Sequence, residues 1–180
     1  MLRSLMLSTA LVVMTMNTAY AGQQYVDESN FAVSGYDPVA YFDLKQAPVG
    51  TSQPEAVPGK ADITAQHNGA TWAFSSEANR AKFLAEPAKY APQYDGHCVY
   101  GVAKGGKVPG NPNLWRIVDD KLFLNITPTI VGFFEEDING FISTAVTNWK
   151  DLEPKDASSK SWKAIDDNKG TYTKSAPEQN

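Results

Sequence analysis

Residues 67–76, HNGATWAFSS, are the most informative stretch of the chain, because they combine the patterns of a tight turn, a strand and a helix cap. Asn68-Gly69 favours the positive backbone angles of a two-residue turn, which glycine adopts without steric cost. The flanking segments 61–66 and 71–74 carry apolar and β-branched residues and predict the two strands. We therefore expect a β-hairpin at the centre of the chain.

A helix is expected directly after this hairpin. Ser75 and Ser76 can cap a helix over 77–85, since serine side chains accept hydrogen bonds from the first free backbone N–H groups. Pro87 ends that helix.

A second hairpin followed by a capped helix is expected further along the chain. Segments 115–118 and 122–125 predict a second hairpin, and Thr127-Pro128 predicts a helix by its cap and first-position proline. Residues 141–149 predict a final helix, and Asp37 can cap a short helical turn. The chain is therefore expected to form a small α+β single domain with two β-hairpins and three to four short helices.

The first residues predict a signal peptide, residues 1–21. Arg3 precedes an apolar run over 5–16, and Ala19-Tyr20-Ala21 matches the small-x-small cleavage pattern. The run is too short for a membrane span, which needs about 20 residues. We expect cleavage near Ala21 and an exported mature chain with no membrane span.

The rest of the chain divides by composition. Residues 22–34 predict a flexible N-terminal arm, 35–150 the folded domain with a C-terminal helical extension, and 151–180 a polar, poorly ordered tail that Trp162 could hold in part. The net charge of −4 gives no electrostatic reason to bind nucleic acid.

The sequence YDGHCVYG, residues 94–101, contains the single cysteine beside one of the two histidines. No intrachain disulfide is possible, so Cys98 is a buried small side chain, a metal ligand, a redox thiol or half of an intermolecular disulfide. A thiolate and an imidazole suit copper(I), which accepts two or three ligands, and His97 and His67 are the other candidates. His67 also fits an exposed turn residue.

Three segments in order resemble the YHS domain family: Asp37-Pro38-Val39, then 67–76, then 83–90, FLAEPAKY. The layout, with 34–42 (SGYDPVAYF) and 94–101, is similar to the stand-alone exported YHS-domain proteins of bacteria. The resemblance implies the α+β fold, an association with metal biology and a periplasmic location.

The chain departs from the family at the metal-ligand positions. Where metal-associated members carry cysteines it has Ala40, Ser75 and Asn79, and the family histidine falls at Ala65. A metal site would therefore have to be rebuilt around 94–101.

These observations give three functional hypotheses. The first is a non-enzymatic module that binds copper through Cys98 and His97, with His67 as a third ligand, in metal trafficking or resistance. The second is a module that binds a small ligand or an exported protein partner, with Cys98 as core packing and a tyrosine-rich face as the site. That face comprises Tyr36, Tyr41, Tyr94 and Tyr100. The third is redox exchange through a Cys98 mixed disulfide. A hydrolase is not expected, because a Cys-His nucleophile pair needs an orienting third group.

Overall fold

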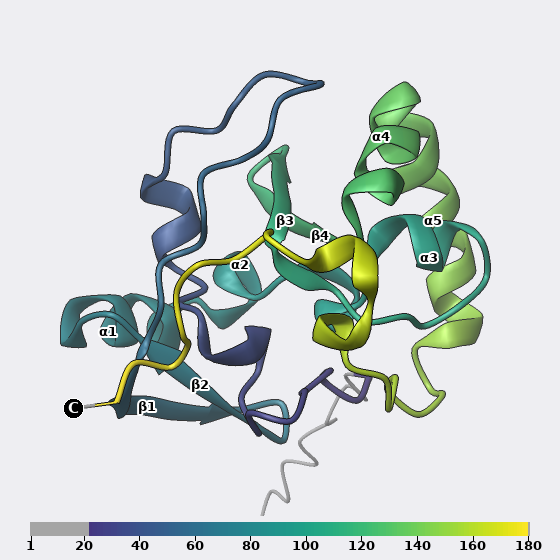
Figure 1. Cartoon of the computed structure of the whole chain (residues 1–180). Helices are drawn as coiled ribbons and strands as arrows, with labels where there is room; N and C mark the ends of the chain where they lie inside the picture. Colours follow the sequence, from purple (N-terminus) through teal and green to yellow (C-terminus); the bar gives the residue numbers. More distant parts are fainter. Residues whose placement is uncertain (1–21, 180) are drawn as a thin grey trace, which may run out of the picture.

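The computed structural model describes residues 22–179, and the signal peptide expected over 1–21 lies outside the described residues. These residues form a small α+β domain built on two antiparallel two-stranded sheets (Figure 1), as the sequence predicts. Its strands and longer helices are β1 Lys60–His67, β2 Ala70–Phe74, α1 Glu77–Ala85, α2 Pro87–Tyr90, α3 Val99–Ala103, β3 Asn111–Val118, β4 Lys121–Asn125, α4 Pro128–Glu136 and α5 Ile138–Leu152.

Both hairpins turn where the sequence predicts. His67 pairs with Ala70 across Asn68-Gly69, whose φ angles are 49° and 71°. In the second hairpin Asp119 and Asp120 take the same left-handed conformation, with φ angles of 49° and 57°. Asparagine, aspartate and glycine tolerate this region best, so the turn residues fix the register of each sheet.

The helix caps also follow the sequence. Ser76 Oγ accepts a hydrogen bond from the Asn79 N–H at the start of α1, and Thr127 Oγ1 caps α4 before Pro128. The expected final helix begins earlier than predicted, because Asp137 caps α5 by accepting from the Gly140 N–H. The short helix α3 was not predicted, since Gly101 lies inside it and glycine disfavours helix interiors.

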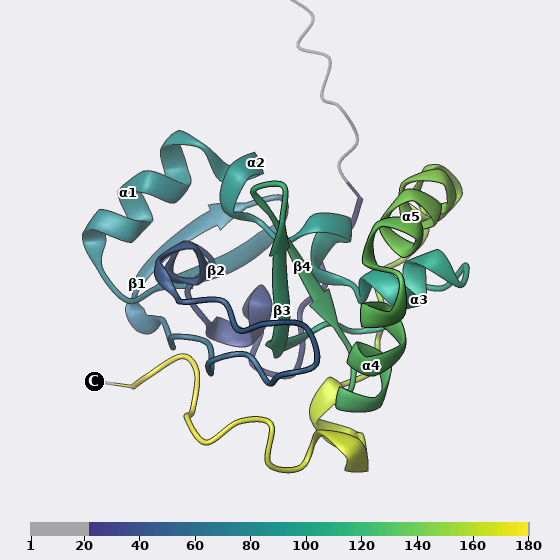
Figure 2. The same ribbon diagram turned by 90° about the horizontal axis from the view of Figure 1, so that it is seen from above.

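The elements pack around two apolar clusters. Figure 2 shows α1 and α2 against the first hairpin, and α3, α4 and α5 grouped beyond the second. The first cluster joins the first hairpin to β3 and β4, with Trp72, Phe74, Phe83, Trp115 and Leu124 fully buried or nearly so. The second joins α3 and α5 to β4, and includes Val99, Val102, Phe123, Phe134 and Ala145.

The structure corrects the expected flexible arm at 22–34. Tyr25 is 2% exposed, and its ring lies 5.7 Å from the ring of His97. The Tyr25 N–H donates to the Asp95 carbonyl oxygen at 2.9 Å. The arm therefore belongs to the packed domain, because its polar appearance conceals aromatic and aliphatic residues that bury on folding.

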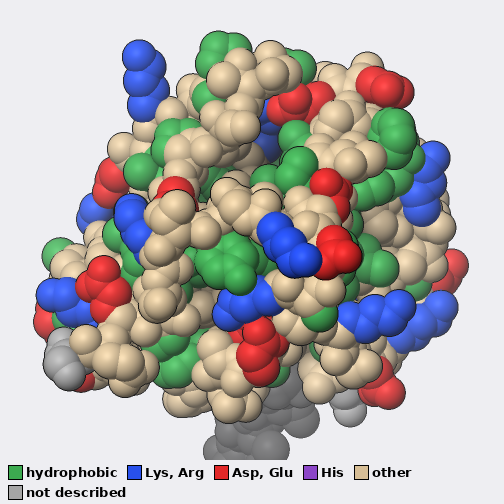
Figure 3. Space-filling model, viewed as in Figure 1, with side chains coloured by type: hydrophobic (Ala, Val, Ile, Leu, Met, Phe, Trp, Pro, Cys, Tyr) green, Lys and Arg blue, Asp and Glu red, His purple; other side chains and the backbone are tan. Residues whose placement is uncertain are grey.

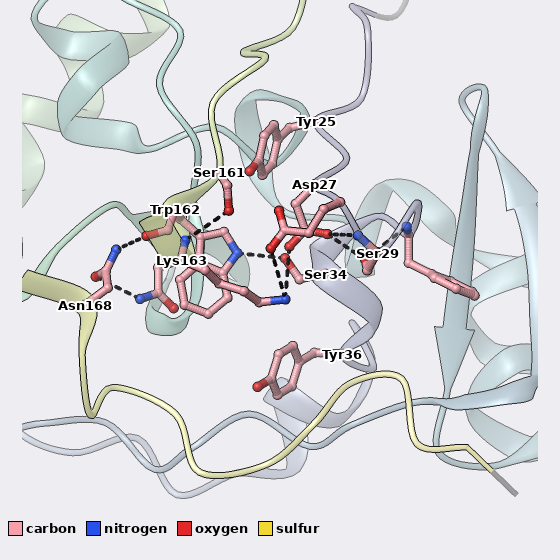
Figure 4. A network of polar contacts seen from close by, with 12 residues as sticks. Tyr25, Asp27, Ser29, Ser34, Tyr36, Ser161, Trp162, Lys163 and Asn168 are labelled. Atoms are coloured by element: carbon pink, nitrogen blue, oxygen red, sulfur yellow. Dashed lines mark hydrogen bonds and ion pairs between the residues drawn. The ribbon is translucent and has the colours of Figure 1, made fainter. Parts of the chain in front are cut away.

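The expected poorly ordered tail is corrected in the same way. Trp162 is fully buried and donates its indole N–H to Ser34 Oγ at 2.8 Å. Lys163 pairs with Asp27, whose side chain is fully enclosed, so the tail and the arm hold each other (Figure 4). The segment then crosses the molecule to end beside β1, where Lys60 forms a bridge with Glu178 (Figure 1). No helix within residues 22–179 is long and apolar enough to cross a membrane.

Candidate functional site

His97 is a structural histidine in the 3₁₀ turn and bend that precede α3. Tyr94, Asp95 and Gly96 all have positive φ angles, and this bend turns the imidazole into the protein. His97 is fully buried, its Nδ1 lies 2.8 Å from the Tyr94 carbonyl oxygen, and Nε2 accepts from the Ser158 N–H at 3.1 Å. Nδ1 therefore carries the hydrogen and donates, so both ring nitrogens are engaged by backbone groups.

Burial sets the charge state of that ring. Desolvation lowers the pKa of His97 from 6.5 to about 4, with a further lowering from the Lys107 charge, while the Tyr94 hydrogen bond acts in the opposite direction. The imidazole is therefore neutral at neutral pH. A metal could bind it only by displacing one of its two backbone partners.

Cys98 caps α3 from inside the core. Its Sγ accepts from the Gly101 N–H at 3.4 Å and donates to Asn125 Oδ1 at 3.6 Å. The residue is fully buried, and desolvation raises the pKa of its thiol to about 11. A thiol of this kind is neither a ready thiolate ligand nor accessible to a mixed disulfide.

His67 does not join these two residues. Its ring packs against Phe83, with 5.5 Å between the ring centroids, and against Trp72. Burial lowers the pKa of its imidazole. Among residues 22–179 no cluster of three or more histidine, cysteine or acidic side chains is placed to hold a metal. The residues present thus do not fit the copper site that the sequence suggested.

The predicted tyrosine face is not one surface. Tyr36 and Tyr41 are core residues of the first cluster, and the Tyr41 hydroxyl donates to the Pro112 carbonyl oxygen at 2.8 Å. Tyr94 belongs to the second cluster, and Tyr100 packs on Phe141 with 4.8 Å between ring centroids. These side chains divide between two cores, so they cannot share one ligand.

Three of the four positions that the YHS resemblance associates with metal ligands, Ala40, Ser75 and Asn79, meet in space around Asp37. Asp37 Oδ1 accepts from the Val39 and Ala40 N–H groups at 2.9 and 3.3 Å. Its Oδ2 accepts from the Ser75 N–H and hydroxyl at 2.8 and 2.6 Å, and from the Asn79 amide at 2.7 Å. In this chain one buried carboxylate, saturated with donors, joins the three segments.

A cavity of about 590 Å³ lies elsewhere, between the loop before β1, β3, α4 and the C-terminal segment. The molecular face in Figure 3 is hollowed between that loop and α4, and its basic and acidic side chains are interspersed. Leu114, Trp115 and Val131 give the wall apolar surface, while Asn113 and Thr171 add polar groups. A Cβ placed on Gly132 in α4 would meet nothing within 4 Å, so this helix face is open.

The acidic residues in the wall are already compensated. Glu135 pairs with Arg116, both side chains being less than a tenth exposed, and its second oxygen accepts from the Gly50 N–H at 2.7 Å. Burial alone would raise the pKa of Glu55, but hydrogen bonds from Thr173 and Lys174 lower it. Both carboxylates are therefore tied to the protein.

Apart from one glycine, no pattern in the sequence indicates this cavity. Its lining comes from four separated segments of ordinary composition, 50–55, 113–115, 128–135 and 169–173. The last of these lies in the segment that composition assigns to a poorly ordered tail. Only Gly132, a glycine inside an apolar helix, is a local irregularity that could have drawn attention to α4.

Comparison with known proteins finds no relative of this chain. No protein-family model matches the chain, and neither curated proteins nor solved structures include a match. The YHS resemblance stays a prediction.

Proposed function

We propose that this protein is a non-enzymatic exported module that binds a small organic ligand in the cavity lined by β3, α4, the loop before β1 and the C-terminal segment. The observation that carries the proposal is the size and composition of that cavity. Its volume of about 590 Å³ falls within the range of small-molecule sites, which combine apolar walls with a few convergent polar groups.

The charges around the cavity favour an uncharged ligand. Glu135 is neutralised by Arg116, and the oxygens of Glu55 are occupied by Thr173 and Lys174. Lys169 has Asp166 as a partner at 2.8 Å. The ligand therefore has an apolar part for Leu114 and Val131 and hydroxyl or amide groups for the polar wall.

No histidine or cysteine lies among the residues that line this cavity. The serine and threonine hydroxyls of its wall therefore have no imidazole base to activate them, which favours recognition over nucleophilic catalysis. Copper binding through Cys98 and His97 is the sequence-based alternative, and it requires the core around α3 to open.

The test is a titration of the ¹⁵N-labelled protein with benzamide and with adenosine, two uncharged probes that combine a planar apolar face with hydrogen-bonding groups. We expect saturable shifts at the amides of Gly132, Gly170 and Trp115. Gly132→Leu should abolish them, because the new side chain occupies the open space without a backbone clash. It should also leave stability unchanged or raised, as glycine is a poor helix residue.

Ser143→Leu is the matched control, since it places the same side chain on an exposed position of α5 away from the cavity. It should retain the shifts. The proposal is rejected if neither probe shifts these amides, or if shifts persist in Gly132→Leu. A parallel copper(I) titration against a chelator distinguishes the alternative, which predicts tight binding that is lost in Cys98→Ala.

A further inference from the structure

The first described residue, Gly22, lies against an unsatisfied carboxylate oxygen. Gly22 is buried, and a Cβ at this position would collide with Asp95 Oδ2 and lie 2.9 Å from the Glu153 carbonyl oxygen. The backbone nitrogen of Gly22 is therefore within about 5 Å of Asp95 Oδ2, given standard bond lengths. Only glycine fits here.

Within residues 22–179, Asp95 Oδ2 is a buried oxygen without a hydrogen-bond partner. The other oxygen of this carboxylate is 3.4 Å from the Asn68 amide, which also donates to the Gly22 carbonyl oxygen at 3.0 Å. The nearby Lys107 is already directed elsewhere, since its Nζ donates to the carbonyl oxygens of Glu153 and Lys155. Buried carboxylates normally have a partner, so this oxygen marks a missing donor.

The sequence supplies such a donor at the same residue. Cleavage after Ala21, which the Ala19-Tyr20-Ala21 pattern predicts, makes Gly22 the first residue of the mature chain. In that hydrolysis a signal peptidase adds water across the Ala21–Gly22 peptide bond. Ala21 leaves as a carboxylate, and the Gly22 nitrogen becomes a charged ammonium with three N–H donors in place of the single amide N–H.

We propose that Asp95 is the receptor for the N-terminal ammonium that signal-peptide cleavage creates at Gly22. Freed from residue 21, the Gly22 nitrogen rotates about one backbone bond toward Oδ2. The Glu153 carbonyl oxygen, near the same position, accepts a second N–H. The inference rests on cleavage after Ala21 and is independent of the proposed ligand cavity.

The ion pair between Gly22 and Asp95 links signal-peptide cleavage to the stability of the turn before α3. Gln24 and Tyr25, just after the new terminus, both donate to the Asp95 carbonyl oxygen at 2.9 Å. Asp95 itself lies in the left-handed region, with a φ of 52°, and the hydrogen bonds from Gln24 and Tyr25 help to hold the turn in that conformation. The ammonium adds to these contacts, so the processed chain holds residues 94–97 more firmly than the precursor.

The test compares the exported, processed protein with a chain that begins at Ala21, which moves the ammonium one residue away while leaving Asp95 intact. N-terminal sequencing of the exported protein should give Gly22. Its α-amine should react with an acylating reagent at pH 7 at least about tenfold more slowly than that of the Ala21 chain, and its melting temperature should be higher by roughly 5 °C. Asp95→Asn should remove most of both differences.

Asp156→Asn is the control, because Asp156 is an exposed acid in the wall of a surface pocket that Gly22 also lines, and its substitution should leave both differences in place. Equal acylation rates and equal melting temperatures for the Gly22 and Ala21 chains overturn the proposal. A processed terminus other than Gly22 also overturns it. The two wild-type chains decide the question even if Asp95→Asn fails to fold.

Discussion

Acid should destabilise this protein in part through His97, and the size of that contribution follows from the surroundings of its ring. Burial lowers the pKa of His97 from 6.5 to about 4. In the unfolded chain the imidazole takes up a proton near pH 6.5, whereas in the folded protein it stays neutral until about pH 4. The unfolded state binds more protons between these values, so stability is complete above pH 6.5 and falls as the pH drops toward 4.

The full shift corresponds to about 3 kcal/mol, since each pKa unit represents 1.36 kcal/mol. Between pH 7.5 and 5.0 most of this difference is expressed, about 2 kcal/mol. Lys107 contributes to it, because its positive charge also disfavours the imidazolium. The hydrogen bond that Nε2 accepts from the Ser158 N–H gives this shift a geometric basis, because a protonated Nε2 could not accept it, whereas the Tyr94 hydrogen bond acts in the opposite direction.

The assay is urea unfolding followed by tryptophan fluorescence at a series of pH values, for the wild type and for His97→Gln. Trp149 lies 6.2 Å from His97 between ring centroids and reports on this region. The wild type should lose about 2 kcal/mol more than His97→Gln between pH 7.5 and 5.0. His67→Gln is the control, and should keep most of the wild-type pH dependence because His67 is less enclosed. Parallel pH profiles for the wild type and His97→Gln would show that burial of the His97 ring does not cause the loss of stability in acid.

Three further predictions concern the core and the tail. The Cys98 thiol is fully buried, and burial raises its pKa to about 11. It should therefore react with a thiol reagent at least about tenfold more slowly in the native protein than in urea. Rapid labelling of the native protein would show that the core around α3 opens. Asp37→Ala should lower the free energy of unfolding by at least about 3 kcal/mol in urea titrations, since it leaves several donors unsatisfied. Asp37→Asn should lower it by less. Equal losses in the two variants would contradict the hydrogen-bonding role of Asp37. Trp162→Ala should lower the free energy of unfolding by about 3–5 kcal/mol and make the segment after residue 162 susceptible to limited proteolysis. In Trp162→Phe this segment should stay resistant. An unchanged digestion pattern in Trp162→Ala would mean that the tail is held by other contacts.

The fold was largely predictable because its signals are local. Asn68-Gly69 and Asp119-Asp120 select left-handed turn residues, and Ser76 and Thr127 provide side-chain caps within three residues of their partners. Each depends on neighbours in sequence, so composition and spacing reveal it. The helix α3 was not predicted because Gly101 lies inside it and because its cap is the sulfur of Cys98, an uncommon capping group.

The candidate sites could not be predicted in the same way. His97 and Cys98 are adjacent in sequence, but His97 reaches Ser158 and Cys98 reaches Asn125. Whether such residues bind a metal depends on which distant backbone groups already occupy their nitrogen and sulfur atoms. The tyrosines share a residue type but not a core, so their number gave no information about a common face.

Local sequence is sufficient to specify the turns, the caps and hence the two hairpins and their following helices, because these interactions form within a few residues. The tertiary structure accounts for the rest. It buried Tyr25 and Trp162 and so made the two chain ends part of the domain, it engaged His97 and enclosed Cys98, and it placed Gly22 beside Asp95. Those outcomes depend on contacts between segments far apart in the sequence, such as Ser158 with His97, 61 residues apart, and Asn125 with Cys98, 27 residues apart, and on the desolvation that only a completed core imposes.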